Sequence, residues 1–347
     1  MNTEDAEEKK TGNLGRTILI VLAVVLLAIL PFVPWFLRGM NQSSAEQAVK
    51  ESGGLASYGK RLHEDATYVT DQKKQGERGI VAELFGEPFV EQLTQVVINK
   101  KLESKNVLAK LSKLRELEIL DVSGTNLSNE DLVTVAKCKT LKKLWISETE
   151  VTSTGLAAVS DLPELASLRL DELPIGDDAM SNLSGHTKLK RLYMDQTQVS
   201  DAGVEQLGAL AELMGIGLQG TKVTDDVIPH LLKFTNLEEL HLGETGLTDA
   251  GVKELVNLPK LKYLSLENTK LTDEGLSWLA QAKALEIVNL SGTEITDGIS
   301  DTLAEMPALI TVSMHRTKVT KEGWNALRRR LGNGVQVQHA EHTELAQ

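Results

Sequence analysis

A threonine recurs every 24 residues over most of this 347-residue chain. Eight of nine grid positions hold threonine, and Leu173 takes the remaining one. Apolar residues also recur at three fixed positions, which lie eight, five and three residues before each grid position. In the first unit these apolar columns are Leu117, Leu120 and Val122. Nine units of one length restrict the fold to a repeat architecture. The threonines are Thr125, Thr149, Thr197, Thr221, Thr245, Thr269, Thr293 and Thr317.

Each unit combines a strand pattern with a helix signal, and its consensus reads L-x-x-L-x-L-x-x-T-x-[VIL]-[TS]-D-x-G-[LV]-x-x-L. The first half alternates apolar and other residues, which is typical of a strand. The Thr/Ser-Asp pair in the second half is typical of a helix N-cap followed by an acidic residue. A single unit cannot bury its apolar face, whereas stacked units share a continuous core. The pattern predicts a solenoid, which explains why only 4% of the residues are aromatic.

These units resemble the leucine-rich repeat family. The stretches Thr248-Asp249-Ala250-Gly251-Val252 and Thr272-Asp273-Glu274-Gly275-Leu276 are similar to its cysteine-containing subclass, with threonine in the cysteine position. Bacterial membrane-anchored proteins with Thr-type repeats are similar as well. The resemblance covers Leu117 to Leu331 and implies an α/β horseshoe, with a parallel sheet on the concave face and short helices on the convex face. It implies little about function, because many unrelated partners are bound by this scaffold.

Several positions on this grid favour structural roles. We expect the threonine hydroxyls to bond backbone groups inside the turns, because buried polar groups need partners. At Leu173-Pro174 a hydroxyl and a backbone N–H are missing, so we expect a distorted loop in the third unit. Cys138 shares its column with Leu162 and Leu210. We interpret it as a small buried residue and not as a reactive thiol.

The repeats set the domain boundaries. We expect a cytoplasmic tail at 1–16, a membrane anchor at 17–37, a linker and N-terminal cap at 38–98, the solenoid at 99–331, and a C-terminal cap and tail at 332–347. Val96-Val97-Ile98 matches the strand columns one unit before Leu120 and Val122, which predicts a degenerate capping repeat. At the other end, Gly332 is expected to stop the last helix, and Val335-Gln336-Val337 to close the final edge.

Thr17–Leu37 holds 21 residues without a charge. At about 1.5 Å per residue, a helix of this length crosses a bilayer core of about 30 Å. Three basic residues precede it and fewer follow, which favours a cytoplasmic N-terminus and an extracytoplasmic repeat domain in a single-pass membrane protein. A cleavable signal peptide cut near Ser43-Ser44-Ala45 and the inverted topology stay open as alternatives.

Composition excludes several functional classes. The formal charge of -12 disfavours nucleic acid as a partner, and one cysteine cannot form an internal disulfide or a Cys-rich metal site. Gly54 to Lys60 matches only the first part of a phosphate-binding loop, since Arg61 stands where Ser or Thr should hold magnesium. His339 and His342 have no third ligand nearby in sequence, and we expect neither a metal nor another cofactor.

The best candidate site lies on the concave strands. Asp121, which directly precedes Val122, and the residues at the same position in the other units face away from the core. In a parallel sheet these residues form one row across neighbouring strands. In that row Arg169 is able to stack against the ring on either side. Three glycines in the unit of Gly217 predict a bare notch that another backbone can approach. The candidate binding residues are Trp145, Arg169, Tyr193, Arg191, Asp171, Asp195, Gly215, Gly217, Glu239 and His241.

Trp, Tyr and Arg are the residues most enriched at binding hot spots, so this row favours recognition of a protein or an envelope polymer without catalysis. A solvated surface with no binding role is the alternative interpretation of these slots. Two other functions stay open. A self-associating envelope scaffold would use the convex face, where we expect Trp278 to be exposed. An enzyme would use Asp171 and Asp195 as paired carboxylates, although no nucleophile or metal cluster accompanies them in the sequence.

Overall fold

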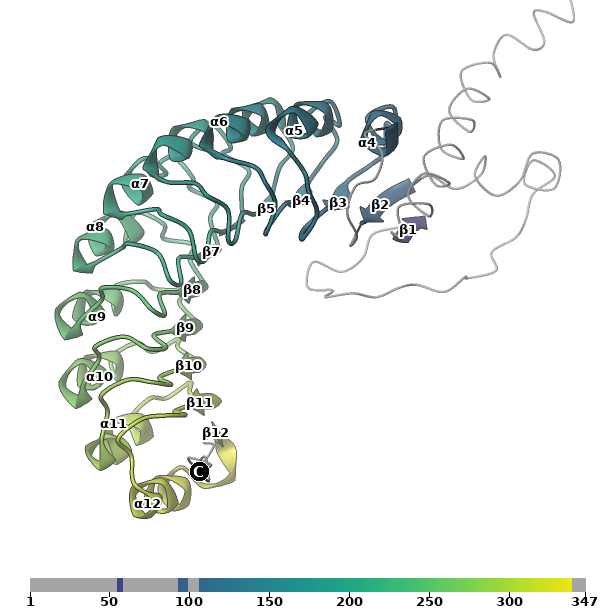
Figure 1. The fold of residues 1–347 in the computed structure, drawn as a ribbon. Helices are drawn as coiled ribbons and strands as arrows, with labels where there is room; N and C mark the ends of the chain where they lie inside the picture. Colours follow the sequence, from purple (N-terminus) through teal and green to yellow (C-terminus); the bar gives the residue numbers. More distant parts are fainter. Residues whose placement is uncertain (1–54, 59–92, 99–105, 339–347) are drawn as a thin grey trace, which may run out of the picture.

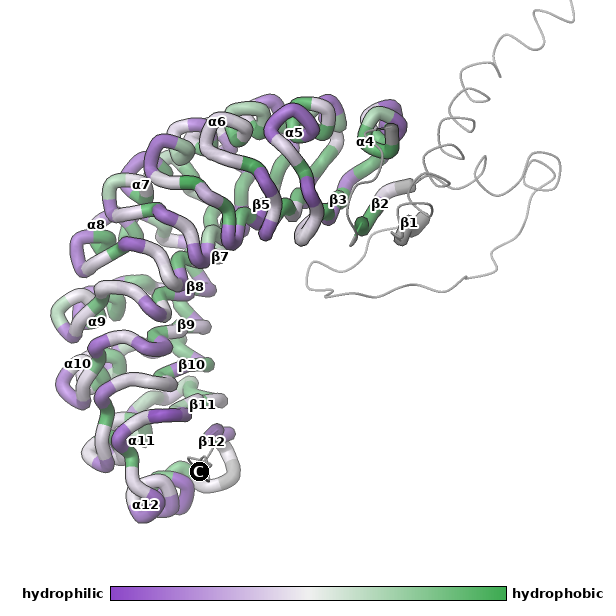
Figure 2. Tube along the Cα trace, viewed as in Figure 1, coloured by the Kyte–Doolittle hydropathy of each residue, from purple (hydrophilic) through white to green (hydrophobic). Residues whose placement is uncertain are grey.

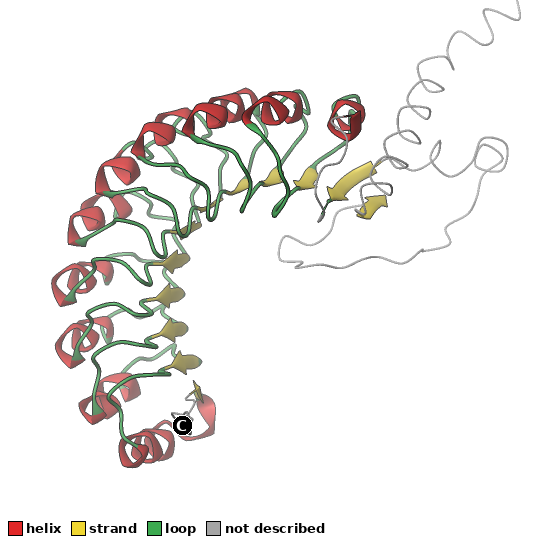
Figure 3. Cartoon of the chain, viewed as in Figure 1, coloured by secondary structure: helices red, strands yellow, loops and turns green. Residues whose placement is uncertain are grey.

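The computed structural model describes residues 55–58, 93–98 and 106–338. These residues form a curved solenoid in which one open sheet lines the inner, concave side and short helices line the outer, convex side (Figures 1 and 3). Strand order in the sheet follows chain order from β1 to β12. The architecture is therefore the predicted α/β solenoid with a parallel concave sheet.

Eleven successive strands, β2 to β12, pair in parallel, and the repeat strands pair residue for residue at the 24-residue spacing. Each repeat strand is only three residues long and has one buried apolar residue at its centre, as Leu144 in β4. The strands are β1 (Leu55–Tyr58), β2 (Leu93–Val97), β3 (Ile119–Asp121), β4 (Lys143–Trp145), β5 (Ser167–Arg169), β6 (Arg191–Tyr193), β7 (Gly215–Gly217), β8 (Glu239–His241), β9 (Tyr263–Ser265), β10 (Ile287–Asn289), β11 (Thr311–Ser313) and β12 (Gln336–Gln338).

Each unit returns along the convex side through a short helix, in several units partly or wholly of the 3-10 type. The α-helices are α4 (Asn106–Leu111), α5 (Asn129–Val135), α6 (Ser153–Leu156), α7 (Asp201–Glu205), α8 (Ile228–Leu231), α9 (Asp249–Leu255), α10 (Asp273–Leu279), α11 (Ser300–Ala304) and α12 (Lys321–Leu331). The 3-10 helices are η3 (Ala157–Asp161), η4 (Asp177–Asn182), η5 (Asp225–Val227), η6 (Asp297–Ile299) and η7 (Gly332–Gly334).

The core lies between the sheet and the helices and runs along the whole solenoid. Its members come from the apolar columns, as with Leu144, Leu168 and Leu192, all of which are fully buried. Hydrophobic residues recur in every unit from β3 to β11 (Figure 2). Aliphatic side chains stacked at one spacing fill this space, and Phe234 is the largest side chain among those fully buried in the described residues.

Both ends of the sheet are capped by strands outside the threonine grid. Val96 pairs with Leu120 and is fully buried, which confirms the degenerate N-terminal unit. β1 then pairs with β2 in the antiparallel direction, so residues 55–58 form an edge strand and not a phosphate-binding loop. At the other end, β12 pairs with β11, and Gly332 ends α12 with a φ of 64°. The predicted C-terminal closure is confirmed.

All eight grid threonines have the structural role expected of them. Each hydroxyl donates to the carbonyl oxygen three residues earlier, as in Thr197 to Met194 at 2.7 Å and Thr221 to Leu218 at 2.6 Å. The residue before the threonine column is left-handed in every unit, with φ between 54° and 70°, although glycine fills this column only at Gly124, Gly220 and Gly292. Gly220 is thus a turn residue rather than part of a strand notch.

The expected distortion at Leu173-Pro174 is wrong. Glu172 keeps the left-handed φ of 58°, and the Leu173 N–H still donates to Leu170 O at 3.3 Å. Leu173 is buried, so its side chain replaces the hydroxyl by packing in the core. In other units the residue at the Pro174 position donates its N–H to the preceding unit, as Gln198 does to Ile175 O at 2.9 Å. Proline removes this one inter-unit hydrogen bond and leaves the turn intact.

The Thr-Asp-x-Gly motif connects consecutive units at the start of each helix. Asp249 accepts two hydrogen bonds from Thr272 in the next unit, from its N–H at 2.8 Å and its hydroxyl at 2.6 Å. A Cβ atom on Gly275 would lie 2.1 Å from the same Asp249 carboxylate. Glycine is required two residues after the aspartate column because the preceding unit's carboxylate occupies that space.

No helix in the described ranges 55–58, 93–98 and 106–338 has the length and apolar character needed to span a bilayer. The predicted anchor at 17–37, the linker from 38 to 54 and the histidines at 339 and 342 lie outside these ranges.

Candidate functional site

The third residues of β4 to β8 form the row expected on the concave face. Register places Trp145 beside Arg169, Arg169 beside Tyr193, and Tyr193 beside Gly217, and His241 follows on β8. These strands lie next to one another on the inner side of the solenoid (Figure 1). The structure therefore brings together candidate residues that lie 24 residues apart in the chain.

Arg169 is sandwiched between two aromatic rings. Its Cζ atom lies 5.9 Å from the centre of the Trp145 ring and 4.8 Å from that of Tyr193, which confirms the expected stacking on either side. The arginine is exposed, Trp145 is half-buried, and Tyr193 is 8% exposed. In the part of the chain that the structure describes, the Arg169 guanidinium has no ion-pair partner. Two rings thus hold a charged, solvent-facing guanidinium in place.

The notch expected over Gly217 is filled by Tyr193, so the expectation of a bare strand is wrong at this position. A Cβ on Gly217 would lie 2.9 Å from Tyr193 Cδ1 and 2.7 Å from Asp195 Oδ1. Beyond the glycine strand, the Tyr193 hydroxyl donates to Glu239 Oε2 at 3.0 Å, which joins β6 to β8. Gly217 has no side chain that would displace the Tyr193 ring, so the ring can approach the backbone of β7 closely.

Gly215 is buried as well, and a Cβ there would lie 3.4 Å from Glu239 Oε2, 3.4 Å from the Tyr193 hydroxyl and 3.5 Å from Arg191 Cγ. A hollow of about 230 Å³ lies beside these side chains. The hollow is lined by Arg191, Met214, Glu238, Glu239, Lys262 and Tyr263.

Glu239 is the centre of a polar cluster on β8 and β9. Its second carboxylate oxygen lies 2.8 Å from His241 Nε2, and this hydrogen bond is the main reason why the pKa of Glu239 is lowered. The His241 ring in turn lies 4.8 Å from that of Tyr263 and 6.0 Å, edge-on, from that of Tyr193. Burial, followed by the charge of Glu239, raises the pKa of both tyrosines, which stay neutral hydrogen-bonding groups. A connected network therefore extends from Trp145 to Tyr263.

Asp171 and Asp195 bind backbone groups of the following units. Asp171 accepts from the Asp195 N–H at 3.0 Å, and Asp195 accepts from the Gln219 N–H at 2.8 Å. Burial, and next the charge of Asp171, raises the pKa of Asp195 to about 6. These two carboxylates thus hold neighbouring turns together, which is a structural role that side-chain alternation alone does not reveal.

Charge is separated into two strips along β4 to β6, although Lys142 pairs with Glu118 of the preceding unit. The basic strip comprises residues 142–145, 166–169 and 190–193, and it contains no acidic residue. The acidic strip comprises residues 147–148, 171–172 and 195–196, at the carboxyl ends of the same strands, and it contains no basic residue. The basic residues are Lys142, Lys143, Arg169, Lys190 and Arg191, and the acidic residues are Glu148, Asp171, Glu172 and Asp195.

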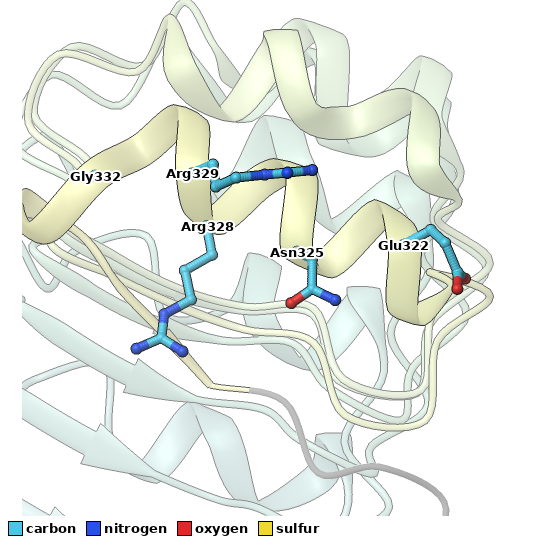
Figure 4. A pocket seen from close by; sticks show the side chains of 5 residues that line it. All are labelled: Glu322, Asn325, Arg328, Arg329 and Gly332. Atoms are coloured by element: carbon cyan, nitrogen blue, oxygen red, sulfur yellow. The ribbon is translucent and has the colours of Figure 1, made fainter.

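A second hollow, of about 620 Å³, lies against α12, where it is lined by Glu322, Asn325, Arg328, Arg329 and Gly332 (Figure 4). All five residues belong to one helix and its end, and Arg328 and Arg329 leave the helix in different directions. Arg328 covers the Trp324 ring, with Cζ 5.5 Å from the ring centre. This hollow lacks the convergent side chains of a binding site.

Two residues outside the concave face were also singled out from the sequence. Trp278 is half-buried, and Lys253 Nζ lies 4.4 Å above its ring, so the expectation of an exposed tryptophan is wrong. Cys138 is 1% exposed, and burial raises the pKa of its thiol to about 12, which confirms an unreactive core residue. Within the described ranges, no group of three or more His, Cys, Asp or Glu side chains is placed to hold a metal ion.

Two members of the site were not predicted from the sequence. Tyr263 begins β9 and Ser167 begins β5, so both belong to the row two residues before the aromatic row. Register alone identifies that row, since Ser167 pairs with Lys143 on one side and Arg191 on the other. Ser167 is small, faces the concave side and is only 8% exposed, so the long side chains beside it must overhang it.

A family model described as a leucine-rich repeat matches residues 235–256 and 257–280. Among solved structures, an internalin (inlF) from Listeria monocytogenes is 17% identical, with a TM-score of 0.43 over 72% of this chain and 87% of the internalin. Internalin C2 from the same organism is 20% identical, with a TM-score of 0.38 over 68% of this chain and 84% of that one. Both TM-scores are below 0.5, so we draw nothing about function from these structures.

No curated protein matches the chain in sequence. The family model covers two consecutive units, and the same strand, turn and helix recur from β3 to β11 with identical register. The chain is therefore a leucine-rich repeat protein.

Proposed function

We propose that this chain is a non-catalytic recognition protein, which binds a protein partner through the concave surface of β4 to β8. The observation that carries this proposal is Arg169, an exposed guanidinium held between Trp145 and Tyr193. Arginine and large aromatic residues dominate the energetics of protein interfaces, particularly when their conformation is fixed before binding. A curved solenoid presents such a row on an extended concave surface.

We also propose that residues 17–37 anchor the protein in a membrane and leave the repeats on the extracytoplasmic side. The support is the uncharged 21-residue length and the basic bias before it. Deleting residues 17–37 should move the protein from the membrane fraction to the soluble fraction of the producing cell. In intact cells, an added protease should degrade the repeats of the full-length protein once any outer barrier is permeabilised. Protection of the repeats under those conditions would reverse the proposed topology.

The recognition proposal is tested by affinity capture from native envelopes. The bait is residues 38–347, used beside a Trp145→Ala, Arg169→Ala variant and an Arg329→Ala variant. Arg329 is an exposed arginine on α12, so it controls for the loss of one positive charge far from the concave row. We expect a partner that the parent bait and the Arg329→Ala bait retain and the double variant loses, by an affinity factor of about 30 or more.

The same partner on all three baits would show that the concave row does not carry recognition. A captured polymer that resists protease and depends on Trp145 and Arg169 would keep the site but change the partner class.

The structure offers no specific observation for the scaffold function. Self-association was expected to use an exposed Trp278, whereas this ring is half-buried beneath Lys253. An enzyme that uses Asp171 and Asp195 is disfavoured because both carboxylates accept hydrogen bonds from backbone amides. Paired catalytic carboxylates need free oxygens directed at a substrate.

A further inference from the structure

Exposed aliphatic side chains gather at one place on the solenoid. In the described part of the chain three large hydrophobic residues are exposed, and two of them, Ile287 at 36% and Ile310 at 52%, belong to consecutive units. Ile287 faces the concave side, because the next residue, Val288, is buried in the core. It pairs with Thr311, which directly follows Ile310. The two isoleucines are therefore diagonal neighbours on adjacent strands near the end of the solenoid (Figure 1).

The isoleucines continue the surface of the candidate site. On its other side Ile287 pairs with Tyr263, whose ring lines the 230 Å³ hollow and lies 4.8 Å from that of His241. Neighbouring strands are about 4.8 Å apart, so Tyr263, Ile287 and Ile310 form an apolar stripe about 10 Å long across β9 to β11. Single exposed apolar residues are common on proteins, whereas adjacent ones mark interaction surfaces.

Four charged residues lie next to this stripe, and one of them lacks a partner. Lys262 Nζ lies 2.9 Å from Glu238 Oε2, and Glu239 is bound by two side chains of the polar cluster. Glu286 is half-buried, and within the described ranges its carboxylate makes no hydrogen bond or ion pair. Its carbonyl oxygen accepts from the Ile310 N–H at 2.8 Å, so this residue lies beside the apolar stripe.

We propose that the apolar stripe and Glu286 form a second contact point, which binds a large apolar side chain of the protein partner and a Lys or Arg beside it. The inference rests on the proposed function and adds the chemistry of the partner. A partner that covers the stripe also removes Glu286 from water, and a buried carboxylate is costly unless a cation pairs with it. Lys262 is already held by Glu238, so the partner has to supply that cation.

The charges of these strands disfavour two other classes of ligand. Residues 238–241, 262–265 and 286–289 contain three glutamates and a single lysine, so an anionic polymer or an anionic membrane surface would be repelled. A wholly apolar ligand would bury Glu286 without compensation. A peptide segment that combines an apolar and a basic side chain satisfies both the stripe and the carboxylate.

The test uses the full-length protein and an array of N-acetylated, C-amidated nonapeptides of random sequence. The parent is compared with an Ile287→Thr, Ile310→Thr variant, which keeps β-branched side chains on the strands but reduces their apolar surface. Val133→Thr is the matched control, because Val133 is the third exposed hydrophobic residue and lies on α5, on the convex side. These variants should unfold at nearly the same temperature as the parent, since all the replaced side chains are exposed.

We expect the parent and Val133→Thr to select peptides in which Leu, Ile, Met, Phe or Trp is close to Lys or Arg. In solution, the isoleucine double variant should bind a selected peptide at least about tenfold more weakly, because the apolar contact is lost.

A second pair of variants tests the charge. Replacing the basic residue of a selected peptide by Gln should weaken binding to the parent at least about fivefold. The same replacement should change binding to Glu286→Gln by less than about twofold, because the pair is already broken. Glu274→Gln, at an exposed glutamate on α10, should behave like the parent.

Several outcomes would overturn the inference. One is a selection without apolar and basic residues together, and another is equal peptide binding by the isoleucine variant. Self-association of the parent that this variant abolishes would assign the stripe to a second copy of the chain. Much tighter peptide binding after deletion of residues 339–347 would assign it to the end of the chain itself.

The capture experiment separates this inference from the proposed function. A partner that the Trp145→Ala, Arg169→Ala bait loses and the isoleucine bait retains at full affinity would leave recognition by the concave row standing and remove only the second contact point. A partner that both baits retain would remove both.

Discussion

The concave row and the edge that carries the Thr-Asp-x-Gly motif are built from the same 24-residue unit, but they differ in what changes along the solenoid. At the motif edge one contact recurs with nearly constant geometry, an aspartate that accepts both the N–H and the hydroxyl of Ser or Thr in the next unit. In the concave row the residue type changes at almost every strand. The recurring pairs are Asp177–Ser200, Asp201–Thr224, Asp225–Thr248, Asp249–Thr272, Asp273–Thr296 and Asp297–Thr320.

The difference separates two kinds of constraint. A contact that recurs in each unit holds the units together, and its loss should change stability alone. A row that varies between units is free to acquire partner-specific side chains, and its loss should change binding alone. Gly217 breaks this rule, because it lies in the varying row and is nevertheless enclosed by Tyr193 and Asp195.

The largest effect is expected at the motif edge. In Gly275→Val, the new Cβ would lie 2.1 Å from Asp249 Oδ1 and 2.5 Å from Leu271 Cδ1. The aspartate must leave Thr272, so we expect the free energy of unfolding, measured by urea titration, to fall by about 3 kcal/mol. Gly185→Ala is the control, since its Cβ would have no neighbour within 4 Å. A small loss in Gly275→Val would show that the carboxylate is not held in place.

Gly217→Ala tests the exception within the concave row. Its Cβ would displace the Tyr193 ring and Asp195, so we expect a loss of about 2 kcal/mol in stability and a loss of partner binding. Gly215→Ala in the same strand is the matched control, because its nearest contacts are at 3.4 Å. If both variants were equally stable, the Tyr193 side chain would be mobile enough to make room for the new Cβ. Gly217 would then be no exception, and residues of the concave row would affect binding alone.

The raised pKa of Asp195 predicts that stability depends on pH, with an effect of intermediate size. Its pKa is raised to about 6 from 3.8, so the folded chain binds this proton more tightly than the unfolded chain. Stability should therefore fall as pH rises from about 4 to about 6, and the cost should be complete above that range. Because the carboxylate is partly solvated, we expect about 1 kcal/mol from this group, measured as urea midpoints against pH.

Asp195→Asn keeps an oxygen for the Gln219 N–H and removes the titrating group. This variant should have a smaller slope in the pH 4–6 window and be more stable than the parent at pH 7. Asp161→Asn, at an exposed position, should leave the slope unchanged. An unaltered slope in Asp195→Asn would assign the titration to another group.

Much of the fold could be predicted because a constant period fixes the register of every column at once. Trp145, Arg169 and Tyr193 were therefore placed side by side from their spacing alone. The contact from Tyr193 to Glu239 depends on how a ring turns once it reaches a glycine strand, which register does not determine. The left-handed backbone directly before the threonine column could not be predicted from the sequence either. Glycine occupies only three of these positions, and Glu, Gln, Asn or Arg occupies the others.

The smallest change in stability is expected for a substitution of Trp145. This substitution best separates an effect on binding from an effect on stability. The indole Nε1 is buried and, among the described residues, has no hydrogen-bond partner, which costs about 1–3 kcal/mol. Trp145→Phe removes this unpaired donor but also loses ring area and part of the attraction to Arg169, worth about 1 kcal/mol or more. The two terms oppose each other, so the free energy of unfolding should change by less than about 1 kcal/mol, while binding of the captured partner weakens measurably. A stable variant with unchanged binding would mean that the indole has no part in recognition and that Arg169 acts alone.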